Sequence, residues 1–595
     1  MGNKKLIQNK LRFFTFAQVV AFLFVAGFLF RWQILEHDRF QAQAESRVIS
    51  SEIQGLRGDI LAADGSVLAY SEPRFDIYVF MNDKFGLLAA EEGGRQTRAE
   101  FVTKVAAELE ISEQDLEDKL AQEKQWIQIA EAVTKKQRDA ILSIPTNRDE
   151  QVHLTGLDYV ETSVRRYPEG ELAAHVLGFV GRDEFGNTVG VNGLEQYFDG
   201  LLRPQSGISS LEQDSNSNLI AISSNVLREA RRGASIHTTI DKNIQSKVQE
   251  QLETAVENFQ ARSATVIVAD PRTGEIKAMA NYPSYNPEDY FKTEDQSVLG
   301  NTAITNPYEI GSVGKIYTMA AAVDQGKVTP NTVVIDGHDG CEEIIEQRII
   351  CTYDKKPQGP LTATDAMIKS DNLAFFHTAQ LVSDKVLADY LQSFGLGNRT
   401  RIQLSGEDEG FIKPGENWNE ADLAAYSYGH SYFQTTLQAV MGVSALANGG
   451  KLMEPTIVRK IEDVTGQTRE YKPLMKREVM KPENVEIMDQ ILHDVYLNNL
   501  YENRYKHLEE YDIAMKSGTA LIPYTALTPP ISRPGYSNEV NSTYIGYDAS
   551  DKNSFIMLVN VSEPQTTPKL SYANARLLWL DTFDEIRNDL GVPKK

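Results

Sequence analysis

The residues of this chain best suited to chemistry stand in three short polar segments, in the order Ser312-Val-Gly-Lys315, Ser370-Asp-Asn372 and Lys516-Ser-Gly-Thr519. A serine hydroxyl is a poor nucleophile until a neighbouring base takes its proton. A lysine amine can be that base when burial and a nearby cation lower its pKa. The three segments together therefore predict a serine nucleophile that is activated by a lysine.

The spacing of the first segment supports this chemistry. Ser312 and Lys315 precede the Ala-rich apolar run IYTMAAAV, which favours a helix. Positions i and i+3 share one face of a helix, so the amine can reach the hydroxyl. Lys516 supplies the neighbouring cation if the third segment folds beside the first. The alternative for the pair alone is an ordinary surface serine and lysine, and the ordered trio argues against it.

The trio resembles the signature set S-x-x-K, S-D-N and K-T-G of penicillin-binding proteins and class A β-lactamases, with Ser517 in place of the usual threonine. The resemblance implies that Ser370 relays protons between Lys315 and a leaving amine, and that the backbone N–H groups of Ser312 and Thr519 form an oxyanion hole. It assigns catalysis to Ser312, Lys315, Ser370 and Lys516, and substrate binding to Asn372, Ser517, Gly518 and Thr519. Taken alone, Ser370 and Asn372 could equally cap the helix that begins near Leu373.

Two positions depart from the family pattern. Val313 stands where threonine is common, and Gly314 lies inside the expected nucleophile helix, where glycine costs about 1 kcal/mol relative to alanine. We expect Gly314 to loosen Lys315, which puts the acylation rate and the β-lactam affinity in doubt. His430, in another segment that resembles the family near its site, is expected to be structural rather than a general base.

The elements that must position these residues alternate between strand-like and helical runs. Strand-like runs occur at SATVIVAD, GEIKAMAN, YDIAMKSGTA, STYIGYD and SFIMLVNVS, and helical patterns lie between the early and the late ones. Strands at both ends of a segment with helices between them indicate an α+β domain with one antiparallel sheet. We place this domain at residues 235–592. By resemblance it has the penicillin-recognising serine acyltransferase fold, with the antiparallel sheet flanked by helices.

The N-terminal region predicts a membrane anchor. An apolar run from Phe13 to Phe30 is long enough to span a bilayer as a helix, and four basic residues precede it. We therefore expect a cytoplasmic tail at 1–12, a single transmembrane helix at 13–31, and the remainder of the chain outside the cell membrane. A cleaved signal peptide is the alternative, but Ala42-Gln43-Ala44 lies too far beyond the apolar run for normal processing. The helix is expected to continue from Glu36 to Gln54.

Residues 45–230 resemble the non-catalytic N-terminal module of class B penicillin-binding proteins, a dimerisation-type pedestal that carries the transpeptidase domain. The resemblance rests on Arg57-Gly58, Asp64-Gly65, Leu68-Ala69, Tyr167-Pro168, His175, Gly178 and Gly193-Leu194-Glu195. Asp64-Gly65 between apolar runs predicts a hairpin turn. A charged segment with helical spacing predicts a helical insertion at about 91–145. Arg57 and Glu195 are expected to form a structural ion pair inside this module.

Composition limits the remaining possibilities. The 595 residues suffice for two or three domains, and the net charge of −23 makes nucleic acid an improbable partner. The two cysteines, Cys341 and Cys351, stand ten residues apart, so either a disulfide across a short hairpin or two free thiols is open. The spacing of histidines and cysteines indicates no metal site, and the sequence indicates no cofactor.

The leading hypothesis is a class B peptidoglycan D,D-transpeptidase that cross-links stem peptides, is a target of β-lactams, and works with a glycosyltransferase of the SEDS family and other division or elongation proteins. A D,D-carboxypeptidase shares the same signatures and stays open. The anchor and the length disfavour a β-lactamase. A β-lactam sensor would need a larger cytoplasmic part, and a silent scaffold would not need all three signatures. Septal and side-wall roles, one- and two-membrane envelopes, the acceptor amine and the oligomeric state are not distinguished.

Overall fold

The computed structural model describes residues 2–37, 48–53, 55–80, 98–122, 124, 126–144, 157–184, 186–212, 225–345, 348–527, 529–550, 552 and 554–595. By its internal contacts the chain forms two units: Met1–Leu56, Arg74–Thr162 and Pro204–Arg232 form unit 1, and Arg57–Pro73, Ser163–Arg203 and Gly233–Lys595 form unit 2. Residues 57–73 and 163–203, which the sequence assigns to the pedestal, thus pack within unit 2. The predicted domain boundaries themselves stay predictions.

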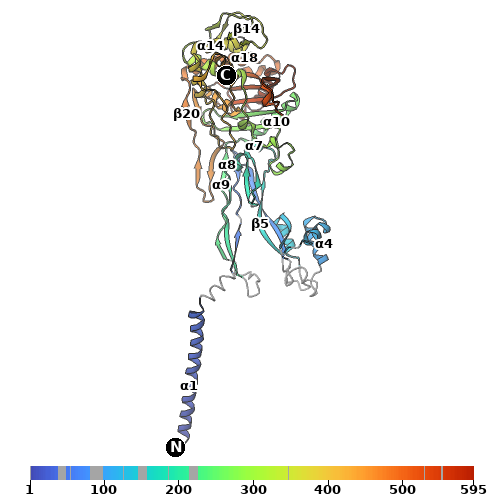
Figure 1. Ribbon diagram of the computed structural model, residues 1–595, viewed down its shortest axis with the longest axis vertical. Coiled ribbons are helices and arrows are strands. Elements are labelled where there is room, and N and C mark those ends of the chain that lie inside the picture. Colours follow the sequence, from blue (N-terminus) through green and yellow to red (C-terminus); the bar gives the residue numbers. More distant parts are fainter. Residues whose placement is uncertain are drawn as a thin grey trace. The chain divides into compact units, whose positions relative to one another are not determined.

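A five-stranded antiparallel sheet is the centre of unit 2 (Figure 1). Its strands, in spatial order, are β12 (Ile276–Tyr282), β11 (Ser263–Ala269), β23 (Ile556–Ser562), β22 (Tyr536–Asp548) and β21 (Ile513–Pro523). The strands are rich in β-branched and aromatic residues, and most of their side chains are buried, as strands covered on both faces require. This confirms the predicted α+β class. The edge strand β21 carries the third polar segment.

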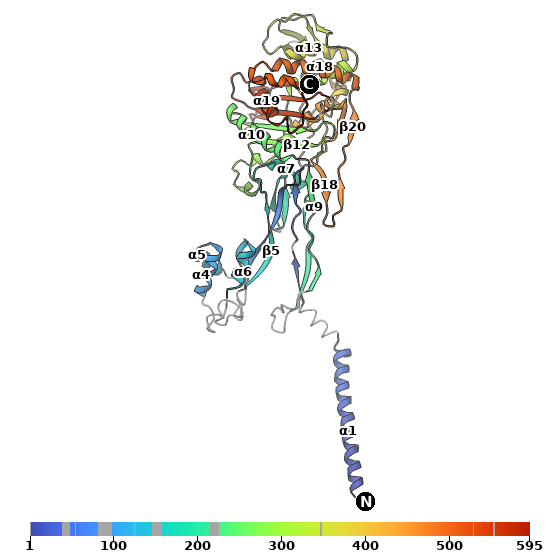
Figure 2. The same ribbon diagram turned by 180° about the vertical axis from the view of Figure 1, so that it is seen from behind.

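Helices cover the sheet. On one face α10 (Lys242–Phe259) packs against β12 and against α19 (Ala575–Ile586), which also contacts β22 and β23, as Figure 2 shows. The side chain of Asp241 accepts hydrogen bonds from two backbone N–H groups of the first turn of α10, which fixes where that helix begins. Other helices that pack on the sheet strands are α11 (Thr302–Thr305), α17 (Thr436–Ser444) and α18 (Pro482–Asn499).

The nucleophile helix α12 (Lys315–Asp324) packs against α14 (Asn372–Val382), α15 (Asp384–Ser393) and α18. Next to these helices, α13 (Ala363–Lys369) packs against α18, and α16 (Glu420–Ser427) packs against α14 and α15. Two small antiparallel strand pairs interrupt this mainly helical stretch: β13 (Val333–Ile335) with β16 (Leu361–Thr362), and β14 (Cys341–Ile345) with β15 (Arg348–Cys351). Cys341 and Cys351 face each other across β14 and β15 and are joined by a disulfide.

A second sheet of unit 2 brings distant segments of the chain together. Its strands are β19 (Thr468–Glu470), β18 (Val458–Glu462), β10 (Ser235–Thr238), β2 (Ile60–Leu61) and the first part of β3 (Val67–Phe80). Asp64-Gly65 forms the predicted turn between β2 and β3, where Gly65 has a φ of 87°. The smaller elements are α7 (Ala174–Leu177), β6 (Phe179–Arg182), β7 (Thr188–Val191), α8 (Gly193–Tyr197), α9 (Asp199–Leu202), β17 (Lys451–Met453) and β20 (Met475–Glu478).

In unit 1, the end of β3 pairs with β4 (Trp126–Val133), and the helices α4 (Arg98–Leu109), α5 (Glu113–Leu120) and α6 (Lys135–Leu142) share a buried apolar core with them. The predicted insertion is thus a small α/β unit rather than purely helical. Strands β1 (Val48–Ile53), β8 (Gly207–Glu212) and β9 (Asn225–Arg228) form a separate sheet, and β5 (Leu157–Arg166) pairs with β3.

The N-terminal helix α1 (Gly2–Phe30) continues as a short π-helix (Arg31–Leu35). Within it, residues 12–35 are long and apolar enough to cross a membrane by length and composition, and none of this stretch is buried. The expected continuation of the helix to Gln54 is wrong, because Val48–Ile53 is a strand that pairs with β8. Backbone pairing with β8, rather than the polar composition of the segment, determines its conformation.

Arg57 and Glu195 form the predicted ion pair within unit 2. Glu195 is fully buried and accepts hydrogen bonds from Arg57 Nε at 2.6 Å, Arg165 Nε at 2.7 Å and the hydroxyl of Tyr167 at 3.3 Å. Asp199 holds a second nitrogen of Arg57 at 2.8 Å. A buried carboxylate between two guanidinium groups neutralises charges that would otherwise be costly in the interior.

Substitution of Glu195 by alanine should lower the free energy of unfolding by about 3–5 kcal/mol, because two buried cations lose their shared partner. The midpoint of denaturant unfolding of the full chain in detergent measures this loss. The exposed Glu184→Ala is the matched control and should leave the midpoint unchanged. Equal midpoints for the two variants would contradict a stabilising role for the buried cluster.

Candidate active site

Ser312 lies in a tight 3₁₀ turn, Gly311–Gly314, that leads directly into α12. The sequence predicts one helix here, and the structure replaces its first turn with this tighter one. Lys315, the first residue of α12, is completely buried, and its Nζ lies 3.0 Å from Ser312 Oγ. The predicted contact between amine and hydroxyl is therefore present.

The surroundings of Lys315 suit an uncharged amine. Its Nζ donates to the backbone oxygen of Ser370 at 2.6 Å and to Asn372 Oδ1 at 2.8 Å, and both of these atoms can only accept. A neutral amine has two N–H bonds and one lone pair, so the lone pair remains for the hydroxyl proton of Ser312. Burial lowers the pKa of Lys315 well below its usual value, and the charge of Lys516 lowers it further, against the opposing effect of Asp371.

Ser370 stands between the two lysines. Its Oγ accepts a hydrogen bond from Lys516 Nζ at 3.0 Å and lies 3.2 Å from Lys315 Nζ. Ser370 ends α13 in the left-handed conformation, with a φ of 54°, which non-glycine residues adopt rarely and often at functional sites. The cap of α14 is Asp371, not Ser370 or Asn372, so the capping alternative does not account for either residue.

The third polar segment lies beside the nucleophile turn because glycines let the two backbones approach. A Cβ at Gly518 would come within 2.5 Å of the Ile310 carbonyl oxygen, and a Cβ at Gly311 would come within 2.8 Å of the Thr519 carbonyl oxygen. Lys516 is buried, and burial lowers its pKa to about 7. Ser517 and Thr519 are both half-exposed, and as alternate residues of β21 they share a face.

The expected oxyanion donors lie on these two touching elements. Since β21 is an edge strand, alternate N–H groups along it have no strand to bond and point away from β22. Ser312 and Thr519 belong to the turn and the strand that meet at Gly311 and Gly518. The hydroxyl of Thr519 accepts a hydrogen bond from the backbone N–H of Ser571 at 3.1 Å, which fixes its rotamer.

The disulfide hairpin and the segment just before it also support the site, and sequence reasoning missed these contacts. Asn372 Nδ2 donates to the backbone oxygen of Cys351 at 3.0 Å, so both ends of the Asn372 amide are engaged, one of them by Lys315. His338 Nδ1 accepts from Gly340 N–H at 3.0 Å, so its other nitrogen carries the proton and donates to buried Asp371 at 2.8 Å. The spacing of these residues in the sequence carries no signal of either contact.

A buried carboxylate braces the nucleophile turn. Glu309 Oε1 accepts hydrogen bonds from Ser431 N–H at 2.9 Å and from the hydroxyl of Tyr536 at 2.8 Å. His430 Nδ1 lies 3.2 Å from the other oxygen of Glu309. The contact of His430 with this brace, rather than with Ser312 or Lys315, agrees with its expected structural part.

Gly314 has a packing role that the sequence does not reveal. A Cβ there would collide with the hydroxyl of buried Tyr432 and come within 2.6 Å of Gly429 Cα. The expected loosening of Lys315 is therefore not what the structure shows, because Lys315 is buried and hydrogen-bonded on several sides.

Gly314→Ala should lower the free energy of unfolding by about 1–3 kcal/mol, the usual cost of overpacking a core, and slow acylation of Ser312 by displacing the turn. Thermal unfolding and the rate of labelling by a fluorescent penicillin measure the two effects. Gly359→Ala, where a Cβ meets nothing within 4 Å, is the control. A Gly314→Ala protein as stable and as quickly labelled as wild type would contradict this packing role.

The two lysines predict the pH dependence of acylation by a β-lactam that bears a carboxylate. On the acid side the rate should fall as Lys315 takes up a proton and loses its lone pair, well below the usual lysine pKa. On the alkaline side the rate should fall near pH 7, where Lys516 loses the charge that attracts the carboxylate. Stopped-flow labelling measures the profile. Lys516→Gln should lack the alkaline limb, and an unchanged limb in that variant would refute its assignment.

Comparison with known proteins shows which family this fold belongs to. Penicillin Binding Protein 2X from Streptococcus thermophilus shares the fold, with a TM-score of 0.72 at 21% identity over 92% of this chain and 83% of that one. Residues 264–578 match the family described as "Penicillin binding protein transpeptidase domain", and residues 52–238 match the family described as "Penicillin-binding Protein dimerisation domain". The chain belongs to the penicillin-binding protein transpeptidase family.

Two curated relatives are similar over most of this chain. "Stage V sporulation protein D" of Bacillus subtilis is 28% identical over 447 residues, which cover 74% of this chain and 67% of the relative. "Peptidoglycan D,D-transpeptidase FtsI" of Escherichia coli is 28% identical over 405 residues, which cover 65% and 64%. The chain thus spans about two thirds of the length of these relatives.

Proposed function

We propose that this chain is a class B peptidoglycan D,D-transpeptidase that cross-links stem peptides through a serine acyl-enzyme. The observation that carries the proposal is the position of Lys315 Nζ, 3.0 Å from Ser312 Oγ with both of its N–H bonds directed elsewhere. That arrangement gives the lysine a lone pair for the serine proton. The family and the relatives named as D,D-transpeptidases support the same reading.

In the proposed reaction, Ser312 Oγ attacks the carbonyl of the penultimate D-Ala of one stem peptide while its proton passes to Lys315. The backbone N–H groups of Ser312 and Thr519 stabilise the oxyanion, a contribution of about a hundredfold or more per donor. Ser370, between Lys315 and Lys516, returns the proton to the departing D-Ala amine. An amine of a second stem peptide then attacks the acyl-enzyme and releases Ser312.

The terminal carboxylate of the donor is the group that the third polar segment is suited to bind. A charged Lys516 attracts it, and the half-exposed hydroxyls of Ser517 and Thr519 can donate hydrogen bonds to it. Gly518 keeps the strand close to the nucleophile. Asn372 first positions Lys315, and its binding to substrate would require its amide to exchange one of these partners. A β-lactam carboxylate would occupy the same position.

We further propose that the apolar helix is a single-pass anchor with a cytoplasmic N-terminus, because Lys4, Lys5, Lys10 and Arg12 precede or begin it. The catalytic unit would then work outside the cell membrane, where the disulfide is permitted. A membrane glycosyltransferase of the SEDS family, which supplies the glycan to be cross-linked in division or elongation, is the partner that this placement suits.

The test is a cross-linking assay with the full chain, a partner polymerase and lipid-linked precursor. A transpeptidase should release D-Ala and form dimeric muropeptides, and Ser312→Ala should form neither product. Release of D-Ala without dimers would instead identify a D,D-carboxypeptidase. The absence of both products from a chain that penicillin labels would support a catalytically weak scaffold.

A further inference from the structure

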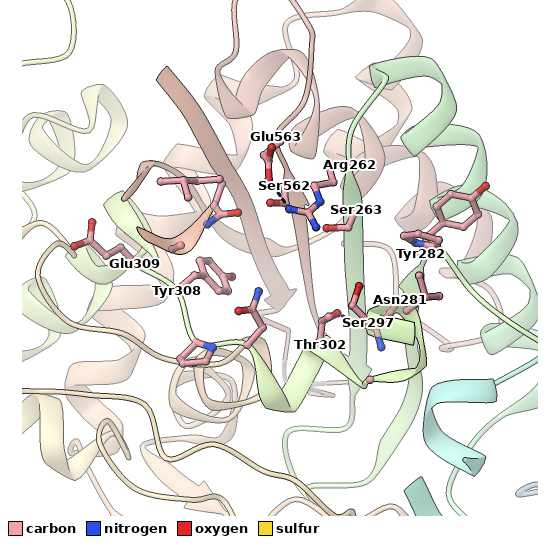
Figure 3. Close-up of a pocket in the computed structure, with 18 of the residues that line it drawn as sticks. Arg262, Ser263, Asn281, Tyr282, Ser297, Thr302, Tyr308, Glu309, Ser562 and Glu563 are labelled. Atoms are coloured by element: carbon pink, nitrogen blue, oxygen red, sulfur yellow. Dashed lines mark hydrogen bonds and ion pairs between the residues drawn. The ribbon is translucent and has the colours of Figure 1, made fainter. Parts of the chain in front are cut away.

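A polar cavity of about 410 Å³ lies at one end of the five-stranded sheet in unit 2 (Figure 3). Ser263, Asn541 and Ser562 line it from three adjacent strands, β11, β22 and β23. They form one row, since Ser263 is opposite Ser562 and Ser562 is opposite Asn541 in the strand register. Residues directly opposite each other share a face of the sheet, so the three polar side chains face the same side.

The row differs from the polar residues behind it. Two residues further along the strands, Thr265 donates to Asn281 at 2.9 Å and Asn560 donates to Thr543 at 3.1 Å, so this inner tier is satisfied by its own hydrogen bonds. The side chains of Ser263, Asn541 and Ser562 are half-buried and have no hydrogen-bond partner in the described part of the chain. Their hydroxyl and amide groups are therefore available to a ligand.

The charges around the cavity disfavour an anion. Arg262 is paired with Glu563 at 3.1 Å, the contact drawn in Figure 3, so its charge is already balanced. Asp295 and Glu309 add two further carboxylates to the lining. Buried His175 adds no positive charge at neutral pH, because burial lowers its pKa to about 4. The lining therefore carries more negative than positive charge, which argues against an anion and suits a ligand whose hydroxyl groups can donate hydrogen bonds to carboxylates.

Apolar side chains form part of the wall of the cavity. The ring of Tyr308, labelled in Figure 3, lies on the same face of the sheet as the row, because its hydroxyl accepts a hydrogen bond at 3.3 Å from Thr543, two residues beyond Asn541 on β22. Pro283, Pro307 and Phe433 also line the cavity. Apolar walls with a few fixed polar groups are the usual composition of small-molecule sites. Hydroxyl and amide groups in a row beside an aromatic ring suit a saccharide, which presents hydroxyls at its edge and C–H bonds on its faces.

We propose that this cavity binds an N-acetylated amino sugar of the glycan strand; the proposal rests on the proposed function. Glu309 at the cavity precedes Ser312 by three residues, so their Cα atoms lie within about 11 Å. A peptide of four residues spans about 13 Å when extended. A sugar in the cavity and a scissile carbonyl at Ser312 can therefore belong to one substrate molecule.

The test is ligand-observed NMR with the full chain in detergent and N-acetylchitotetraose as the probe. Wild type should give saturable transfer at millimolar concentration. Asn541→Ala should raise the dissociation constant about three- to tenfold, as the loss of one hydrogen bond does. Ser562→Leu, which fills the cavity, should raise it at least about tenfold. Asn498→Ala, an exposed asparagine on α18, is the matched control.

No saturable signal from wild type, or equal binding by all variants, would overturn the glycan site. So would equal competition by a sugar-free pentapeptide, because the site would then recognise the stem. Thermal unfolding of each variant shows whether it is folded. Penicillin labelling of wild type in the same samples tests the proposed function separately. A protein that is labelled by penicillin but does not bind the saccharide would therefore refute the cavity proposal alone.

Discussion

Ser312→Ala should reduce covalent labelling by a fluorescent penicillin at least about 10⁴-fold, because it removes the oxygen, 3.0 Å from Lys315 Nζ, on which the acyl bond would form. Gel fluorescence after a fixed exposure measures the label, and mass spectrometry locates it. The fold should be unaffected, because the substitution removes a single oxygen atom. The close approach of Gly311 to Thr519 and the hydrogen bond between Glu309 and Ser431 still hold the turn.

Ser370→Ala is the matched control for this experiment. It removes an equivalent hydroxyl 3.2 Å from the same amine, but the label should still form on Ser312, at a lower rate. Undiminished labelling of Ser312→Ala would refute the assignment of the nucleophile. Loss of labelling only in Ser370→Ala would transfer that assignment to the second segment.

Lys315→Met should slow acylation by about 10²- to 10⁴-fold, the usual contribution of a general base. Methionine fills much of the buried volume of the lysine, so the variant removes the lone pair without leaving a large cavity. The second-order rate constant for labelling measures the effect. The residual rate should no longer show the acid limb of the wild-type pH profile, because the titrating amine is gone.

Lys327→Met, an exposed lysine just beyond α12, is the control and should retain the wild-type rate and profile. A Lys315→Met rate within a factor of three of wild type would show that another group takes the proton of Ser312. Lys516 would then be the first candidate, because its amine is also buried and its pKa lies near 7.

The parts of the structure that depend on local patterns could be predicted from the sequence. The three signatures, the Asp64-Gly65 turn and the strands around Lys516 are each encoded within a few residues. The α+β class follows from the order of these elements. The contact of Ser312 with Lys315 follows from their spacing, although the first turn is 3₁₀ rather than α-helical.

The parts that depend on distant contacts could not be predicted. Cys351 holds Asn372, and Ser571 holds Thr519, across separations that no periodicity connects. The effect of Gly314 depends on Tyr432, a residue of another segment. The strand at Val48–Ile53 depends on its pairing with β8. In each case a tertiary partner outweighs the local preference.

The order of strands in the five-stranded sheet constrains how this protein is made. The middle strand, β23, is synthesised near the end of the chain, yet it joins the early hairpin of β11 and β12 to the late pair of β21 and β22. The early hairpin, one face of which α10 can already cover, therefore lacks its neighbouring strand until the end of the chain is made, and such an unpaired strand edge favours aggregation. A message truncated after Thr519 would encode every signature residue but neither β22 nor β23, so the five-stranded sheet could not form.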